Sequence, residues 1–170
     1  MMSGGTAIQD DLVVAVVRTF VTGHMADAIA ELEASIDKAR PLKDALLRFG
    51  VLALKVVAND SRARSLHRVI VAAAGQSNVG ELFFAAGPAQ MLSRLAQLIA
   101  LSAQRGEIRT VDPDIAAQQF TALLNAQVSG RIYQQAPQAL KAAQLKPMVT
   151  MAVEFFLSAV APVPEGKALG

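Results

Sequence analysis

Apolar residues recur at helical spacing along almost the whole chain, and clean alternation of apolar and polar positions is absent. This pattern predicts an all-α fold, a bundle of about six helices. Prolines, glycines and capping side chains set the expected boundaries. The expected helices span about residues 9–37, 41–58, 60–75, 79–105 with a kink at Gly87–Pro88, 113–133 and 147–160.

Two of these helices are apolar around most of their circumference. The helix at 41–58 has one apolar face with Leu46 and Phe49 and a second with Val51 and Leu54, which predicts a central position. The last helix keeps only a narrow polar edge, and Pro147 is expected to start it. A terminal helix of this kind needs a second surface, so we expect a homodimer.

The apolar stripe of the first helix changes side partway along. One side carries Leu12, Val13, Val16, Val17 and Phe20, and a rotated stripe follows with Met25, Ile29, Leu32 and Ile36. A single core contact does not require such a rotation. We therefore expect the two stretches to contact different surfaces.

Length and composition narrow the class of protein. A chain of 170 residues with 53% hydrophobic and 18% charged residues is expected to form one domain at 9–160, with a flexible leader at 1–8 and a tail at 161–170. The net charge of +2 does not by itself indicate a nucleic-acid surface. The absence of cysteine and of an apolar run long enough for a bilayer favours a cytoplasmic protein.

Residues for catalysis or metal binding do not gather in the sequence. His24 and His67 lie on different expected helices without a carboxylate at ligand spacing. A nucleophile with its base, a phosphate-binding loop and paired acids are also absent, so we expect neither an enzyme nor a cofactor. The basic residues Arg62, Arg64, His67 and Arg68 are interpreted as a solvated helix face.

The stretch GEIRTVDPDIAAQQF, residues 106–120, resembles the junction between two late helices in the C-terminal domains of tetracycline-repressor-like (TetR family) transcription regulators. The segments RSLHRVIVAAA at 64–74 and ELFFAAGPAQMLSRLAQLIALSAQ at 81–104 are similar to the helices before that junction. The resemblance covers roughly residues 11–160. It is closest to the subgroup with an AefR-like C-terminal domain.

The family's helix-turn-helix signature has no counterpart in this sequence. The segment DDLVVAVVRTF at 10–20 resembles the linker helix that follows the DNA-binding domain. The resemblance therefore implies the sensing and dimerising part of a regulator, without the part that reads DNA. DNA would be bound only through a domain that this sequence does not contain.

The resemblance also implies a pocket for a small apolar or amphipathic inducer. The candidate ligand-binding residues are His67, Phe83, Phe84, Met91, Leu95, Gln127 and Arg131. Each has an alternative interpretation: a boundary histidine, plain core for the apolar residues, and a core hydrogen bond or a solvent-reaching side chain for Gln127 and Arg131. The candidate dimer interface, on the last two long helices, comprises Phe120, Leu124, Val128, Val149, Val153, Phe156 and Val160.

The sequence thus predicts a small-molecule-sensing and dimerisation domain of a TetR-like regulator. In the mechanism implied by the family, the ligand enters the helical pocket and shifts the linker helix. The alternative is a dimeric helical interaction module that binds no ligand.

Overall fold

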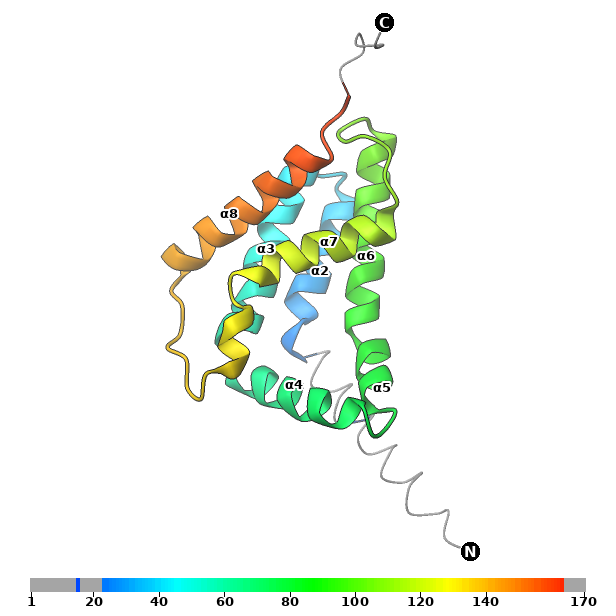
Figure 1. Cartoon of the computed structure of the whole chain (residues 1–170). Helices are drawn as coiled ribbons and strands as arrows, with labels where there is room; N and C mark the ends of the chain where they lie inside the picture. The colour runs from blue at the N-terminus through cyan, green and yellow to red at the C-terminus, as the bar shows by residue number, and fades with distance from the viewer. Residues whose placement is uncertain (1–14, 16–22, 164–170) are drawn as a thin grey trace, which may run out of the picture.

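The protein is described by a computed structural model covering residue 15 and residues 23–163. Within these residues the chain forms helices and no strand, which confirms the all-α prediction. The helices, shown in Figure 1, are α2 (Ala26–Asp37), α3 (Leu42–Asn59), α4 (Ser61–Ala74), α5 (Val79–Ala86), α6 (Pro88–Gln104), α7 (Pro113–Ala126), the 3₁₀ turn η1 (Ser129–Tyr133) and α8 (Ala142–Ala159).

Helix α3 lies at the centre of the bundle and contacts five other helices, α2, α4, α6, α7 and α8. In Figure 1, α2, α3 and α6 run along the length of the molecule, α7 crosses them, and α4 lies across one end. The central place of α3 is the one that its two apolar faces predict.

Three phenylalanines join α3, α7 and α8 in the core. The ring centroids of Phe49 and Phe120 lie 6.4 Å apart, and those of Phe120 and Phe156 lie 5.3 Å apart in an edge-to-face arrangement. Such pairs add about 1 kcal/mol each beyond the area they bury. Close by, Gly50 of α3 lets the helix approach Val149 of α8.

Two predicted helix boundaries in the middle of the chain are wrong. The expected kink at Gly87 is a complete break between α5 and α6, because Gly87 adopts φ −156° and ψ −57°. Helix α7 ends at Ala126, and the residues up to Tyr133 form the separate turn η1.

The last helix starts at Ala142 rather than at Pro147. The amide of Lys141 donates to the side chain of Gln144 (2.9 Å), and the amide of Gln144 donates to the carbonyl of Lys141 (2.9 Å), so the helix begins five residues earlier. Pro147 is tolerated inside the helix because it removes only the bond to the carbonyl of Ala143, near the helix start.

The first expected helix is tested only in its later part. Helix α2 begins at Ala26, after a bend at Met25, so the described part of this segment is not one continuous helix. The apolar residues Leu12, Val13, Val16, Val17 and Phe20 lie outside the described residues.

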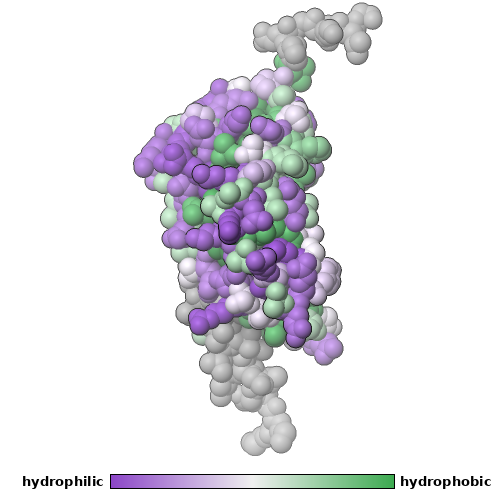
Figure 2. All heavy atoms as spheres, turned by 90° about the vertical axis from the view of Figure 1, so that its left-hand side faces the viewer, coloured by the Kyte–Doolittle hydropathy of each residue, from purple (hydrophilic) through white to green (hydrophobic). Residues whose placement is uncertain are grey.

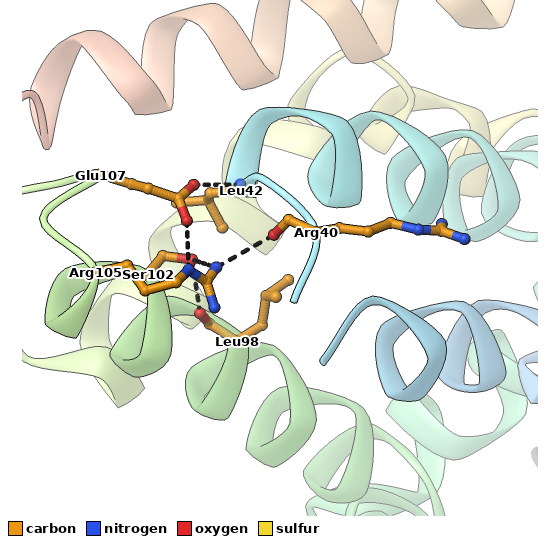
Figure 3. Close-up of polar contacts among 6 residues, drawn as sticks. All are labelled: Arg40, Leu42, Leu98, Ser102, Arg105 and Glu107. Carbon is orange, nitrogen blue, oxygen red and sulfur yellow. Dashed lines mark hydrogen bonds and ion pairs between the residues drawn. The ribbon is translucent and has the colours of Figure 1, made fainter. Parts of the chain in front are cut away.

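The junction between α6 and α7 fastens several helices together. The carboxylate of Glu107 accepts from the amide of Leu42 (2.6 Å) and from the guanidinium of Arg105 (2.6 Å), and Arg105 also donates to the carbonyl of Arg40 and the hydroxyl of Ser102 (Figure 3). Gly106 supplies the φ of +74° that turns the chain away from α6.

The same junction holds the end of α8 and the start of α7. The amide of Arg109 donates to the carbonyl of Val160 (2.9 Å). The side chain of Asp112 accepts from the amides of Asp114 and Ile115 (3.0 Å each), so it caps α7 as the sequence predicts.

One face of the molecule, turned toward the viewer in Figure 2, mixes hydrophilic residues with small separate hydrophobic patches. None of the helices in the described part of the chain is both long and apolar enough to span a bilayer.

Candidate ligand-binding pocket

A cavity of about 520 Å³ lies among α3, α4, α6, α7 and η1, with contributions from α5 and the residues just before α2. Its volume falls in the range typical of small-molecule sites. Apolar side chains cover much of its wall, namely Met25, Val56, Val57, Phe83, Pro88, Met91, Val128 and Ile132.

Two arginines bring charge to this wall. Arg64 of α4 is only 9% exposed, and its Nη1 donates to the carbonyl of Ala58 at 3.1 Å. Arg131 of η1 donates from Nε to the same carbonyl at 3.1 Å, and from Nη2 to the carbonyl of Gln138. Both cations therefore meet at the C-terminal end of α3.

Backbone carbonyls also anchor a third arginine nearby. Arg68 donates from Nε to the carbonyl of Ile132 (2.7 Å) and from Nη2 to that of Gln134, so α4 is fastened to η1. The expectation of a wholly solvated basic face on α4 is therefore wrong for Arg64, which is buried, and Arg68 is tied to η1. Because the side chains of Arg64 and His67 are three residues apart, both line the cavity.

The edge of the pocket next to α2 carries an ion pair between His24 and Asp60. The other carboxylate oxygen of Asp60 accepts from the amides of Arg62 (2.9 Å) and Ala63 (3.0 Å), which caps α4. One aspartate thus fixes the start of α4 and joins it to the segment before α2.

Four of the candidate ligand-binding residues line the cavity: His67, Phe83, Met91 and Arg131. The other three lie elsewhere. Phe84 is 51% exposed, Leu95 is buried in the main core, and Gln127 is exposed, with its Nε2 donating to the carbonyl of Met148 (3.0 Å). Gln127 does make a hydrogen bond within the chain, but on the surface and not in the core as the alternative expected.

Sequence reasoning missed several lining residues, among them Arg64, Thr121 and Asn125. The spacing from Arg64 to His67 was the available signal, since it places the two on one helix face. Thr121 and Asn125 carry a similar signal, because they lie four residues apart on one face of α7.

A second apolar hollow, an open groove of about 610 Å³, runs between α7 and α8. Ile115 and Phe155 line it and are exposed to 53% and 64%. The seven candidate interface residues are instead buried within the single chain, although Phe156 and Val160 also reach the groove lining. Those on α7 and α8 fill the core because α7 packs against α6, α8 packs against α3, and the two helices pack against each other.

Among the described residues, histidine and acidic side chains do not gather in groups of three or more that could hold a metal ion.

The arrangement of these helices is similar to that in two solved structures. A protein from Mesorhizobium loti, described as a TetR-family transcriptional regulator, shares the fold with a TM-score of 0.75 at 21% identity, over 88% of this chain and 74% of its own. The flavonoid-responsive regulator FrrA aligns with a TM-score of 0.63 at 22% identity, over 81% and 72%. At such identities the likeness concerns the fold.

The amino-acid sequence identifies the family more specifically than the fold does. Residues 44–162 match the sequence profile of the AefR-like transcriptional repressor C-terminal domain. The chain belongs to this family, as its resemblance predicts. No curated protein sequence matches the chain.

Proposed function

We propose that this chain is the small-molecule-sensing and dimerisation domain of its regulator. The observation that carries the sensing part is the cavity of about 520 Å³, which combines a largely apolar wall with a few converging polar groups. The lining includes His24 and Met25, just before α2, so a ligand bound there would touch the segment that leads toward the N-terminus.

Thermal unfolding tests the sensing proposal. Hydrophobic aromatic and acyl compounds are added, and a ligand that binds the folded chain raises the melting temperature. The methyl NMR signals of Met25 and Met91, which line the cavity, should shift with the bound compound, whereas that of Met148, outside the lining, should not. Compounds that stabilise the chain without moving the Met25 and Met91 signals would contradict the proposal.

A pocket-filling variant sharpens this test. Met91→Trp places a larger side chain into the cavity and should abolish ligand binding while the chain stays folded. Val71→Trp is the matched control, because Val71 is 61% exposed on α4 and does not line the cavity. Unchanged binding in Met91→Trp would show that the compound binds elsewhere.

The groove between α7 and α8 supports the dimerisation part. Ile115, Met151 and Phe155 expose large apolar side chains along these two helices. Scattered exposed apolar residues are ordinary, but these continue a groove that the chain itself leaves open. A second copy that places its own α7 and α8 on this surface would cover the groove and these exposed side chains. The interface would then be formed by them and not by the buried residues that the sequence indicated.

Analytical ultracentrifugation tests this surface. The unaltered chain should sediment as a dimer at micromolar concentration, and Phe155→Glu as a folded monomer, because Phe155 supports little of the single chain's own core. Val69→Glu is the matched control, since Val69 is 63% exposed on α4, away from the groove. A monomeric unaltered chain, or a Phe155→Glu chain that remains dimeric, would overturn the assignment.

A further inference from the structure

We propose that the pocket selects an organic anion: an apolar ring system or acyl chain that carries a carboxylate, bound at Arg64 and Arg131. This inference rests on the proposed sensing function and adds the chemical class of the ligand. The charge of the lining is the first argument. Its described charged side chains are the two arginines, and none of its members is acidic.

The two arginines lack a carboxylate partner within the described chain. The ion pairs found there join His24 to Asp60, Arg40 to Glu31, Arg94 to Glu33 and Arg105 to Glu107. Arg64 and Arg131 instead share one neutral acceptor, the carbonyl of Ala58. A cation buried as deeply as Arg64 is ordinarily paired, because desolvation of an unpaired charge is costly.

The C-terminal end of α3 offsets this charge only in part. A helix end carries the equivalent of about half an elementary negative charge, whereas two guanidinium groups carry two positive ones. Both donor nitrogens lie 3.1 Å from the same oxygen, so the two groups also repel each other. A carboxylate bound beside them would relieve this repulsion and accept charge-assisted hydrogen bonds.

Other hydrogen-bonding side chains lie on the same wall of the cavity. The side-chain amide of Asn125 and the imidazole of His67 line the cavity without a hydrogen bond to another described side chain or backbone group. An amide donates two N–H groups, which a carboxylate oxygen accepts. Binding of an anion would therefore use polar groups that the folded chain leaves available.

The apolar part of the wall defines the rest of the ligand. Val56, Phe83 and Met91 come from three different helices and face the same cavity. A volume of about 520 Å³ suits a body of two fused rings or a medium-length acyl chain more than a small polar acid. Acetate or phosphate alone would leave this apolar wall uncovered.

The test compares acids with amides of the same carbon skeleton. Naphthoate is compared with naphthamide, and decanoate with decanamide, by calorimetric titration of the full chain at one fixed salt concentration. We expect the carboxylate to bind at least about tenfold more tightly than its amide in each pair that binds. The Met25 and Met91 methyl signals report whether binding occurs in the cavity.

Variants assign the preference to the arginines. Arg131→Gln keeps N–H donors but removes the charge, so it should weaken carboxylate binding at least about tenfold and change amide binding less than about twofold. Arg131→Lys should retain part of the preference. Arg62→Gln is the matched control, because it removes the same charge from an exposed side chain outside the lining, and it should change neither affinity by more than about twofold.

The outcomes separate this inference from the proposed function. If acid and amide bind in the cavity with equal affinity, or if Arg62→Gln weakens the acid as much as Arg131→Gln, the selection of anions is refuted while the pocket remains a ligand site. If neither member of either pair binds and the methyl signals do not move at millimolar concentration, the anion inference fails. Should neutral compounds in the thermal screen also fail, the sensing proposal fails with it.

Discussion

The carboxylate of Glu107 accepts a hydrogen bond from the backbone amide of Leu42, which lies 65 residues earlier in the chain. Leu42 is the first residue of α3, and Pro41 before it offers no side-chain acceptor. The amides at a helix start carry partial positive charge and lack partners within the helix. A charged residue from the α6–α7 junction therefore caps the central helix of the bundle.

Replacing Glu107 by Gln should lower the free energy of unfolding by about 1–2 kcal/mol, because the charged acceptor shared by Leu42 and Arg105 is lost. Urea unfolding measures the change. Glu154→Gln is the control, since Glu154 is exposed on α8 and has no ion pair or hydrogen bond of its side chain. Equal effects of the two substitutions would contradict a capping role for Glu107.

Asp112→Ala should destabilise the fold by about 1 kcal/mol, the usual effect of losing a side-chain cap. Its carboxylate accepts from two amides of the first turn of α7. Asp114→Ala removes a charge from the same turn but no cap, and should cost less than half as much. The two are compared by thermal unfolding, and the reverse order would refute the cap.

The close approach of α3 and α8 at Gly50 predicts coupling to Val149. A methyl group at Gly50 would lie 2.6 Å from Cγ1 of Val149, a buried and stiff side chain. Through this overlap, Gly50→Ala should lower the free energy of unfolding by about 1–3 kcal/mol. The higher helix propensity of alanine offsets up to about 1 kcal/mol of this loss.

A double-mutant cycle isolates the overlap. In a Val149→Ala chain, Gly50→Ala should become neutral or stabilising by up to about 1 kcal/mol, which gives a coupling energy of about 1–3 kcal/mol. Gly75→Ala is the control, because an added methyl group there meets nothing within 4 Å. Additive effects of the Gly50 and Val149 substitutions would show that the helices adjust freely.

The loop before α8 should depend on Asn59. Its side chain donates to the carbonyl of Leu140 and accepts from the amide of the same residue, both at 2.8 Å. Asn59→Asp removes the donor, so cleavage of residues 134–141 by a protease should rise several-fold while global stability falls by about 1 kcal/mol.

Asn78→Asp serves as the control for that measurement, because Asn78 is exposed before α5 and its side chain makes no capping bond. Cleavage rates are followed by mass spectrometry under native conditions. If the loop is cut no faster in Asn59→Asp than in Asn78→Asp, the hydrogen bonds from Arg68 to Gln134 and from Arg131 to Gln138 are sufficient to hold the loop.

Local signals predicted the fold well where they were strong. Asp112 followed by Pro113, and the apolar circumference of α3, led to a correct helix start and a correct central position. The start of α8 was missed because the cap formed by Lys141 and Gln144 is a weaker signal than Pro147. Helical spacing alone did not distinguish the kink expected at Gly87 from the break that the structure shows.

The pocket was predicted less completely, and for a tertiary reason. Phe83 and Phe84 are neighbours with the same chemistry, and only the packing of α5 against α4 decides that Phe83 faces the cavity. Likewise, the apolar faces of α7 and α8 do not reveal by themselves whether the chain's own helices or a second copy covers them. Within the single chain, α7 packs mainly against α6 and α8, and α8 packs against α3 and α7.

The bond between Glu107 and Leu42 has a consequence for synthesis on the ribosome. At roughly 5–20 residues per second, several seconds pass between the addition of Leu42 and that of Glu107. During this interval the first amide of the central helix has only water as its acceptor. The bundle's middle helix is made early, but its start is secured only when the α6–α7 junction has left the exit tunnel.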